Sequence, residues 1–157
     1  MRHKKVGKRK IEADKKYKSI LVAKFVNYLM RDGKQTVARK VLYNAFEILR
    51  SKNQDIIPIF EKAIQNVAPR QEVRARRVGG ASYQIPVEVK TDRRMSLAIR
   101  WLIMAAHKRS SRDYHTFSEK LAAEFMDAIE NRGEAIRKRD MMHRMAQANR
   151  AFAHFRW

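Results

Sequence analysis

Residues 72–89, EVRARRVGGASYQIPVEV, decide the fold, because here the apolar period changes from the 3.6 residues of a helix to the 2 residues of a strand. We expect strands at 72–78 and 82–89 on either side of Gly79-Gly80, joined as a β-hairpin. Pro86 falls inside the second strand, which a two-stranded ribbon tolerates since each strand is an edge. An isolated hairpin is only marginally stable, so this one should project from a larger body and be steadied by what it touches.

The register of the hairpin also follows from its apolar residues. If the apolar faces of the two strands pair with one another, the connecting loop must have an odd number of residues. We therefore predict a three-residue loop at 79–81, with the cross-strand pairs Val73–Val87, Ala75–Ile85 and Arg77–Tyr83.

Helical periodicity surrounds the hairpin on both sides. Before it, we expect helices at 20–31 (capped by Ser19) and 35–50, and a third that Asp55 caps and Pro69 ends. After it, we expect a helix at 93–108, one opened by a capping box of Thr116 and Glu119, and one from Gly133 to about Asn149. In the second helix the predicted inward stripe is Val37, Val41, Leu42, Ala45, Ile48 and Leu49.

The predicted fold class is mainly α: a single domain of about six helices, with a protruding two-stranded β-hairpin between the third and fourth. The domain organisation is a basic N-terminal arm at 1–18, a helical domain at 19–149 with the hairpin at 72–89, and a basic and aromatic C-terminal tail at 150–157. We expect the arm to become ordered only on its ligand. The first helix is apolar nearly all round, which predicts a central, buried position.

The charge of the chain points to a polyanionic partner. Its 157 residues include 36 Lys and Arg against 16 Asp and Glu, a formal net charge of +20. The excess lies in three stretches, residues 1–18, 74–112 and 137–157, whereas residues 113–136 are acidic. An ordinary solvated surface mixes the two signs, so this segregation favours a binding footprint.

Several classes of function are excluded by what the sequence lacks. It has no cysteine, no apolar run long enough to span a membrane and no apolar signal-peptide core, so we expect a cytoplasmic protein. It carries no Walker A motif, no Gly-rich dinucleotide loop and no paired histidines for a metal, and its five histidines are scattered. The acidic residues Glu119, Glu124, Asp127 and Glu130 are spaced around a helix, as on a solvated or protein-contacting face. We expect no enzyme activity, no metal and no cofactor.

The basic elements fit RNA better than duplex DNA. Three arginines with Tyr83 on a slender ribbon combine phosphate contacts with a ring that can stack on a base. On and after the fourth helix, six residues mark one rigid basic face: Arg93, Arg94, Arg100, Lys108, Arg109 and Arg112. Two alternatives stay open: an RNA-processing enzyme, which would need clustered acid–base or metal ligands, and a DNA-compacting basic protein, which would bind duplex DNA and folded RNA equally.

Several motifs resemble one known family. They are RRVGG at 76–80, YQIPVEV at 83–89, RW at 100–101, HRMA at 143–146, AN at 148–149, AFAH at 151–154, RW at 156–157, KFVN at 24–27 and DGK at 32–34. Together they resemble small ribosomal subunit protein seven of the bacterial type, over essentially the whole chain. Gln35 departs from the pattern, because the family usually has a second basic residue there.

The resemblance implies a structural constituent of the small ribosomal subunit that binds the 3′ major domain of 16S rRNA and nucleates assembly of the head. It implies a place at the subunit interface near the exit-site tRNA and the decoding centre, and contacts with small-subunit ribosomal proteins nine and eleven. Some family members also bind their own operon mRNA and repress its translation. A bacterial ribosome is the expected location, with an organelle-encoded protein as the alternative.

Two sets of residues follow from the charge pattern and the resemblance together. The expected rRNA-binding residues are Arg2, His3, Lys4, Lys5, Lys8, Arg9, Lys10, Lys34, Arg74, Arg76, Arg77, Arg93, Arg94, Arg100, Lys108, Arg109, Arg112, Arg137, Lys138, Arg139, His143 and Arg144. The expected tRNA-proximal residues are Val78, Gly79, Gly80, Ala81, Ser82, Tyr83, Arg150, His154, Arg156 and Trp157.

Overall fold

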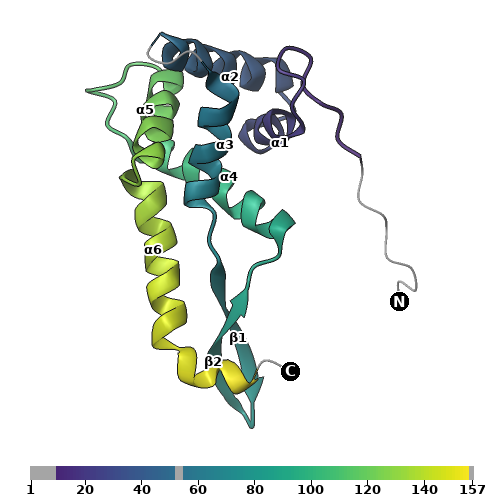
Figure 1. Ribbon diagram of the computed structural model, residues 1–157, viewed down its shortest axis with the longest axis vertical. Helices are drawn as coiled ribbons and strands as arrows, with labels where there is room; N and C mark the ends of the chain where they lie inside the picture. Colours follow the sequence, from purple (N-terminus) through teal and green to yellow (C-terminus); the bar gives the residue numbers. More distant parts are fainter. Residues whose placement is uncertain (1–9, 52–54, 156–157) are drawn as a thin grey trace.

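A computed structural model describes residues 10–51 and 55–155, and it shows a helical body from which one hairpin extends (Figure 1). The helices are α1 (Ile20–Leu29), α2 (Gln35–Arg50), α3 (Ile56–Val67), α4 (Thr91–Lys108), α5 (Phe117–Ile129) and α6 (Gly133–Ala148), followed by a short 3₁₀ helix, η1 (Arg150–Phe155). The strands β1 (Gln71–Val78) and β2 (Ala81–Glu88) form an antiparallel hairpin between α3 and α4. The predicted fold class is confirmed.

The helices begin largely where local chemistry predicts. Thr116 and Glu119 form the predicted capping box, in which each side chain accepts a hydrogen bond from the backbone N–H of the other residue. The Ser19 hydroxyl accepts the N–H of Val22 at the start of α1. Asp55 occupies the N-cap position of α3, but its side chain makes no capping hydrogen bond, so that part of the prediction is wrong.

Four phenylalanines from four helices form the centre of the core. Phe25, Phe46, Phe60 and Phe125 are each fully buried, and five pairs of their rings lie with centroids 5.2–6.3 Å apart. Most of these pairs meet edge to face, the arrangement that the quadrupoles of aromatic rings favour. This cluster joins α1, α2, α3 and α5 into one body.

Two sequence predictions about burial are wrong. The first helix is not buried on all sides: α1 buries Val22, Phe25 and Val26, whereas Ile20 is 54% exposed, because the helix packs at the edge of the body. In α2, Val37 is 57% exposed and its neighbour Ala38 is buried instead. Both errors arise because apolar character alone does not say which helices are available to cover a face.

The hairpin register also differs from the prediction. Gly79 and Gly80 have φ angles of 57° and 89°, and they form a two-residue loop with Val78 paired to Ala81. Two consecutive positive φ angles match the tight turn that suits the strand twist, and glycine adopts them without strain. The loop of three residues is therefore wrong, and the cross-strand pairs are Glu72–Val87, Val73–Pro86, Arg74–Ile85 and Arg76–Tyr83.

The C-terminal residues brace the hairpin rather than forming a separate tail. In Figure 1, α6 runs beside the base of the hairpin, and η1 crosses the hairpin closer to its tip. The Tyr83 ring of β2 lies 5.2 Å from the ring of Phe152 and 5.5 Å from that of Phe155, between centroids. Residues 150–155 thus belong to the folded body, and the hairpin is supported along one side.

Part of the predicted N-terminal arm is also folded against the helices. The carboxylate of Asp14 is buried and accepts hydrogen bonds from the N–H groups of Lys16 and Tyr17 and from the Tyr43 hydroxyl of α2. Burial, and then the hydrogen bond to Asp14, raises the pKa of Tyr43 to about 12. Residues 14–18 therefore lie against the helical body, where Asp14 anchors them on α2.

Candidate nucleic-acid interface

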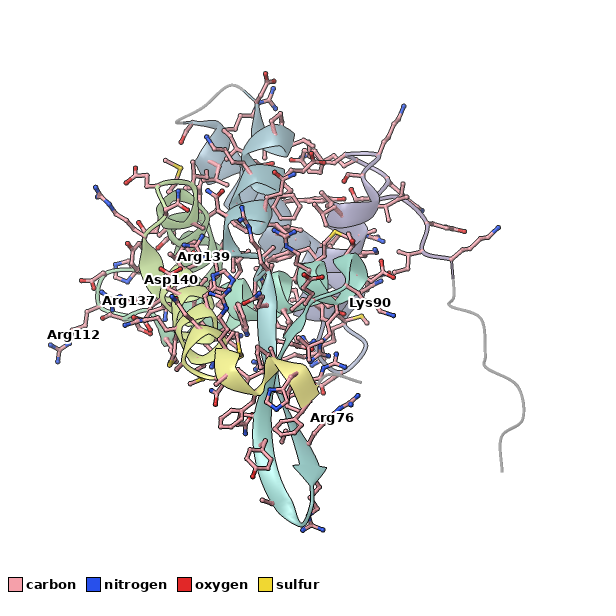
Figure 2. The ribbon with its side chains drawn as sticks, turned by 60° about the horizontal axis from the view of Figure 1, so that its bottom comes forward. Arg76, Lys90, Arg112, Arg137, Arg139 and Asp140 are labelled. Carbon is pink, nitrogen blue, oxygen red and sulfur yellow. The ribbon has the colours of Figure 1, made fainter. Side chains whose placement is uncertain are left out.

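The expected RNA-binding residues are spread over several surfaces of the folded body. Figure 2 shows Arg112 and Arg137 on one side of the view, with Lys90 and Arg76 on the other. The exposed residues among those expected to bind rRNA are Lys10, Lys34, Arg74, Arg76, Arg77, Arg93, Arg100, Lys108, Arg112, Arg137, Lys138 and Arg144. Eight further residues of the two sets lie outside the described part of the chain: Arg2, His3, Lys4, Lys5, Lys8, Arg9, Arg156 and Trp157.

The basic residues of α4 do not form the single face that the sequence predicts. Arg93 and Arg100 are two turns apart and share one side of the helix, whereas Arg94 is rotated about 100° from Arg93. Arg94 accordingly lines a cavity with residues of α3 and α6, and Arg109 turns towards α5. The face divides because successive helical residues point in different directions, and each direction meets a different neighbour.

A buried carboxylate ties the hairpin to the start of α4. Glu72 of β1 is 4% exposed and accepts hydrogen bonds from Arg93 Nε at 2.7 Å and from Arg74 Nε at 2.7 Å. Burial alone would raise the pKa of Glu72, but the hydrogen bonds from Arg93 and Arg74 outweigh it and hold the pKa below its usual value. Glu72 thereby sets the orientation of the hairpin and of both guanidinium groups.

Glu72 was missed by sequence reasoning, although the sequence held a signal for it. It stands two residues from Arg74, so both side chains fall on the same face of the strand. An acid within so basic a segment is a candidate for an internal partner of the arginines.

An aromatic site lies between α1 and α4. The Arg100 guanidinium lies 6.0 Å from the centre of the Tyr28 ring, whose hydroxyl donates to Ser96 Oγ at 2.9 Å. Tyr28 is 42% exposed and borders a cavity of about 620 Å³ that Lys10 and Lys24 also line. A ring fixed in this way beside three cations can stack on a nucleobase while the cations contact phosphates. Sequence reasoning assigned Tyr28 no role.

A second basic group forms where α4 meets α6. Lys108 of α4 and Arg137 and Lys138 of α6 line one cavity of about 110 Å³, together with Met104 and Met141. These three cations come from two of the basic stretches, which are therefore brought together in space. Arg137 is also bonded to Glu134 at 2.6 Å on an exposed face, where such a pair contributes little to stability.

Arg109 is occupied inside the protein, which argues against its predicted role in RNA binding. Its side chain is 16% exposed, and its Nε and Nη2 donate to Glu124 Oε2 at 2.9 and 2.6 Å, with Asp127 as a further partner. Burial alone would lower the pKa of Arg109, but the hydrogen bonds to Asp127 and Glu124 outweigh it and raise the pKa. Its charge is neutralised by α5.

Glu124 corrects the prediction that the acidic residues of α5 all lie on an outer face. It is 1% exposed, and its Oε1 accepts the N–H of Ala135 in the first turn of α6 at 3.1 Å. Gly133 has a φ angle of 90°, and a Cβ there would lie 2.9 Å from Glu124 Oε1. The close approach of Glu124 to the N-terminus of α6 therefore requires glycine at this position.

Arg139 and His143 also have structural roles that the sequence did not show. Arg139 Nη1 donates to the carbonyl oxygen of Asn66 at 2.5 Å, and its Nη2 pairs with Asp140 at 2.7 Å. His143 Nε2 accepts the N–H of Arg70 at 3.0 Å, so the imidazole is neutral with its proton on Nδ1. Burial, and then the charge of Arg139, lowers the pKa of His143. Arg139 thus joins α6 to the last turn of α3, and His143 joins α6 to the segment after α3.

The short helix η1 lies against β2, so two parts of the predicted tRNA-proximal set are close in space. The exposed tip residues are Gly79, Gly80, Ala81 and Ser82, and the exposed residues of η1 include Arg150 and His154. The His154 ring lies tilted against the Phe155 ring with centroids 3.9 Å apart, and Phe155 in turn lies against Tyr83. These ring contacts join η1 to the strand that leads from the hairpin tip.

Within residues 10–51 and 55–155, no group of three or more His, Asp or Glu side chains is arranged to hold a metal ion. No helix in the same described part of the chain is both long and apolar enough to cross a membrane.

The fold and its surface define a mainly helical, strongly basic protein whose hairpin arm projects from one end. The chain matches the family model of ribosomal protein S7p/S5e over residues 1–150. It is 52% identical over 99% of both chains to small ribosomal subunit protein uS7 of a Caulobacter species and to that of Acidithiobacillus ferrooxidans, and 50% identical to that of Vibrio atlanticus. The chain belongs to the ribosomal protein S7p/S5e family, and it is a structural, non-enzymatic constituent of the small ribosomal subunit.

Proposed function

We propose that this chain binds the 3′ major domain of 16S rRNA directly and nucleates assembly of the head of the small subunit. The observation that carries the proposal is a pair of cation groups on the helical body, one between α1 and α4 and one where α4 meets α6. In one group Lys10, Lys24 and Arg100 lie beside the exposed Tyr28, and in the other Lys108, Arg137 and Lys138 meet. Cations on rigid helices fix the register of an RNA backbone, because phosphate contacts position a protein without reading sequence.

The proposed rRNA-binding set is revised by the contacts of each side chain. Arg109 is left out, because α5 neutralises it, and Arg139 and His143 serve first to hold α6. The residues before Lys10 stay in the set on their charge alone. Glu72 does not bind RNA but holds Arg74 and Arg93 at the hairpin base.

The test of this proposal is competition for the full-length chain between the isolated 3′ major domain of 16S rRNA and other polyanions. Specific protein–DNA complexes exceed their non-specific binding by about 10³-fold or more, and we expect a preference of this size over an unrelated RNA of equal length. Equal affinity for duplex DNA would favour a DNA-compacting protein instead. Equal affinity for the unrelated RNA would leave only non-specific binding and contradict the proposal.

We propose, as the family resemblance implies, that the hairpin acts near the exit-site tRNA, and shortening the hairpin tests this. Replacing residues 77–82 with a two-residue Asn-Gly turn keeps the Arg76–Tyr83 pair and the buried Ile85. We expect affinity for the rRNA fragment to change by less than about tenfold, because at most one phosphate contact is lost, at Arg77. Binding of tRNA to the exit site of reconstituted subunits should weaken by about tenfold or more.

The control for this variant is Arg77→Gln in a hairpin of full length, which removes the charge without removing the arm. If Arg77→Gln alone reproduced the loss of tRNA binding, charge rather than reach would explain it. If the shortened hairpin instead abolished rRNA binding, the hairpin would be part of the anchor and the proposed division of labour would fail.

We further propose contacts with small-subunit ribosomal proteins nine and eleven, a place near the decoding centre and a cytoplasmic, ribosomal location, as the family resemblance implies. The exposed Met104, Met141 and Met145 supply adaptable apolar surface for a protein partner. Repression of the operon mRNA would use the same RNA-binding surface. His143 is not free to act as a general base of the kind that an RNA-processing enzyme needs, because its Nε2 accepts the N–H of Arg70.

A further inference from the structure

A polar cavity of about 330 Å³ lies between the C-terminal part of α3, α4 and α6. Arg94 of α4, Arg139 and His143 of α6 and Arg70 line it, together with Asn66 and other residues of α3. No carboxylate is among the residues that line it. The cavity therefore brings three arginines together, and none of its lining residues is acidic.

Arg94 is the least satisfied cation of this group. Its Nε is buried and has no hydrogen-bond partner, and in the described part of the chain no carboxylate pairs with it. The only other buried Nε without a hydrogen bond among those residues, that of Arg39, lies 3.7 Å from the Asp14 carboxylate. A buried donor left unpaired destabilises the protein, and a charged donor does so more than a neutral one. Arg94 thus lacks an acceptor that bears negative charge.

The other residues of the cavity are held in place by the protein itself. Arg139 is fixed by Asp140 and by the carbonyl oxygen of Asn66, and Figure 2 shows Arg139 and Asp140 together on α6. The backbone N–H of Arg70 donates to His143 Nε2. Their positions are therefore set before any ligand arrives, and preorganised donors lose little entropy on binding.

The chemistry of the cavity selects the kind of anion. A guanidinium donates through its Nε and Nη groups as a planar fork that matches the oxygens of a phosphate. The volume exceeds what a single inorganic ion needs, so there is room for a phosphate that continues into a chain. We propose that this cavity binds one phosphodiester group of an RNA strand, whose non-bridging oxygens accept hydrogen bonds from Arg94. This inference rests on the proposed function, and it makes Arg94 a phosphate ligand distinct from the exposed cations of α4.

The first test uses inorganic phosphate as the probe and needs no RNA. Thermal unfolding of the full chain is followed as phosphate replaces chloride at constant ionic strength. At a phosphate concentration ten times its Kd, we expect the Tm to rise by about 3–6 °C and then to approach saturation. The variant Arg94→Gln should lose this rise, and Arg50→Gln, which removes an exposed arginine at the end of α2, should keep it. Equal rises in all three proteins would overturn the site.

The second test uses the isolated 3′ major domain of 16S rRNA. Removing one phosphate contact reduces the slope of log K against log salt by about 0.9, so Arg94→Gln should show this reduction and Arg50→Gln should not. A phosphate effect that depends on Arg94, with no change of slope, would mean that the cavity takes another anion, such as a carboxylate of a protein, and would overturn its assignment to RNA. If the unaltered chain showed no preference for this rRNA, the proposed function would be contradicted. The anion site would not be, because the phosphate test measures binding to the cavity without RNA.

Discussion

The affinity of the chain for the 3′ major domain of 16S rRNA should fall by about 10³–10⁵-fold between about 50 and 200 mM salt. Each phosphate that a lysine or arginine neutralises releases condensed counterions, and about 6–10 such contacts give a slope of this size. The thirteen cations of the revised set that lie among the described residues are Lys10, Lys34, Arg74, Arg76, Arg77, Arg93, Arg94, Arg100, Lys108, Arg112, Arg137, Lys138 and Arg144. Equilibrium binding measured at several salt concentrations gives the slope directly.

A pair of matched double variants shows whether the slope comes from the proposed surface. Arg100→Gln with Lys108→Gln removes two exposed cations of α4 and should reduce the slope by about 1.8. Arg50→Gln with Lys62→Gln removes the same charge from exposed positions on α2 and α3 outside the proposed set, and the slope should stay as it was. Equal reductions in the two double variants would mean that net charge rather than a defined surface binds the RNA.

The helices could be predicted from the sequence because their signals are local. The capping box of Thr116 and Glu119, the proline in the first turn of α3 and the glycines at 33 and 133 act within a few residues of where they stand. The hairpin could be located for the same reason, since its period and its glycines are contiguous. The register of the hairpin could not be predicted in this way. The prediction assumed that the apolar residues of the two strands pair with one another, whereas the positive φ angles of Gly79 and Gly80 set a two-residue loop.

The functional state of each cation could not be predicted, because it depends on partners that are far away in the sequence. Arg93 and Arg94 are adjacent and chemically identical, but one meets Glu72 of the hairpin and the other a cavity with no carboxylate. Arg109 and Arg112 are three residues apart, and only Arg112 is exposed. The net charge of the chain does not distinguish these four arginines. Tertiary contacts divide them into cations that hold the fold together and cations that remain available to RNA.

The variant Arg109→Ala should destabilise the protein by about 3–5 kcal/mol, measured as the free energy of unfolding in urea. The side chain of Glu124 is 1% exposed, so removing Arg109 leaves a carboxylate buried without its charged partner. Exposed Arg112→Ala should change the free energy of unfolding by no more than about 0.5 kcal/mol. Loss of stability together with an unchanged salt slope for rRNA would assign Arg109 to the fold and not to the RNA.

The second change Glu124→Gln distinguishes a buried charge from simple loss of packing. Added to Arg109→Ala, it removes the unpaired charge, and the amide oxygen of Gln can still accept the N–H of Ala135. The double variant should therefore be more stable than Arg109→Ala alone, although it has lost one more native side chain. If Arg109→Ala cost less than about 1 kcal/mol and lowered the salt slope for rRNA, the contact with Glu124 would be dispensable and the role in RNA binding that the sequence suggests would be restored.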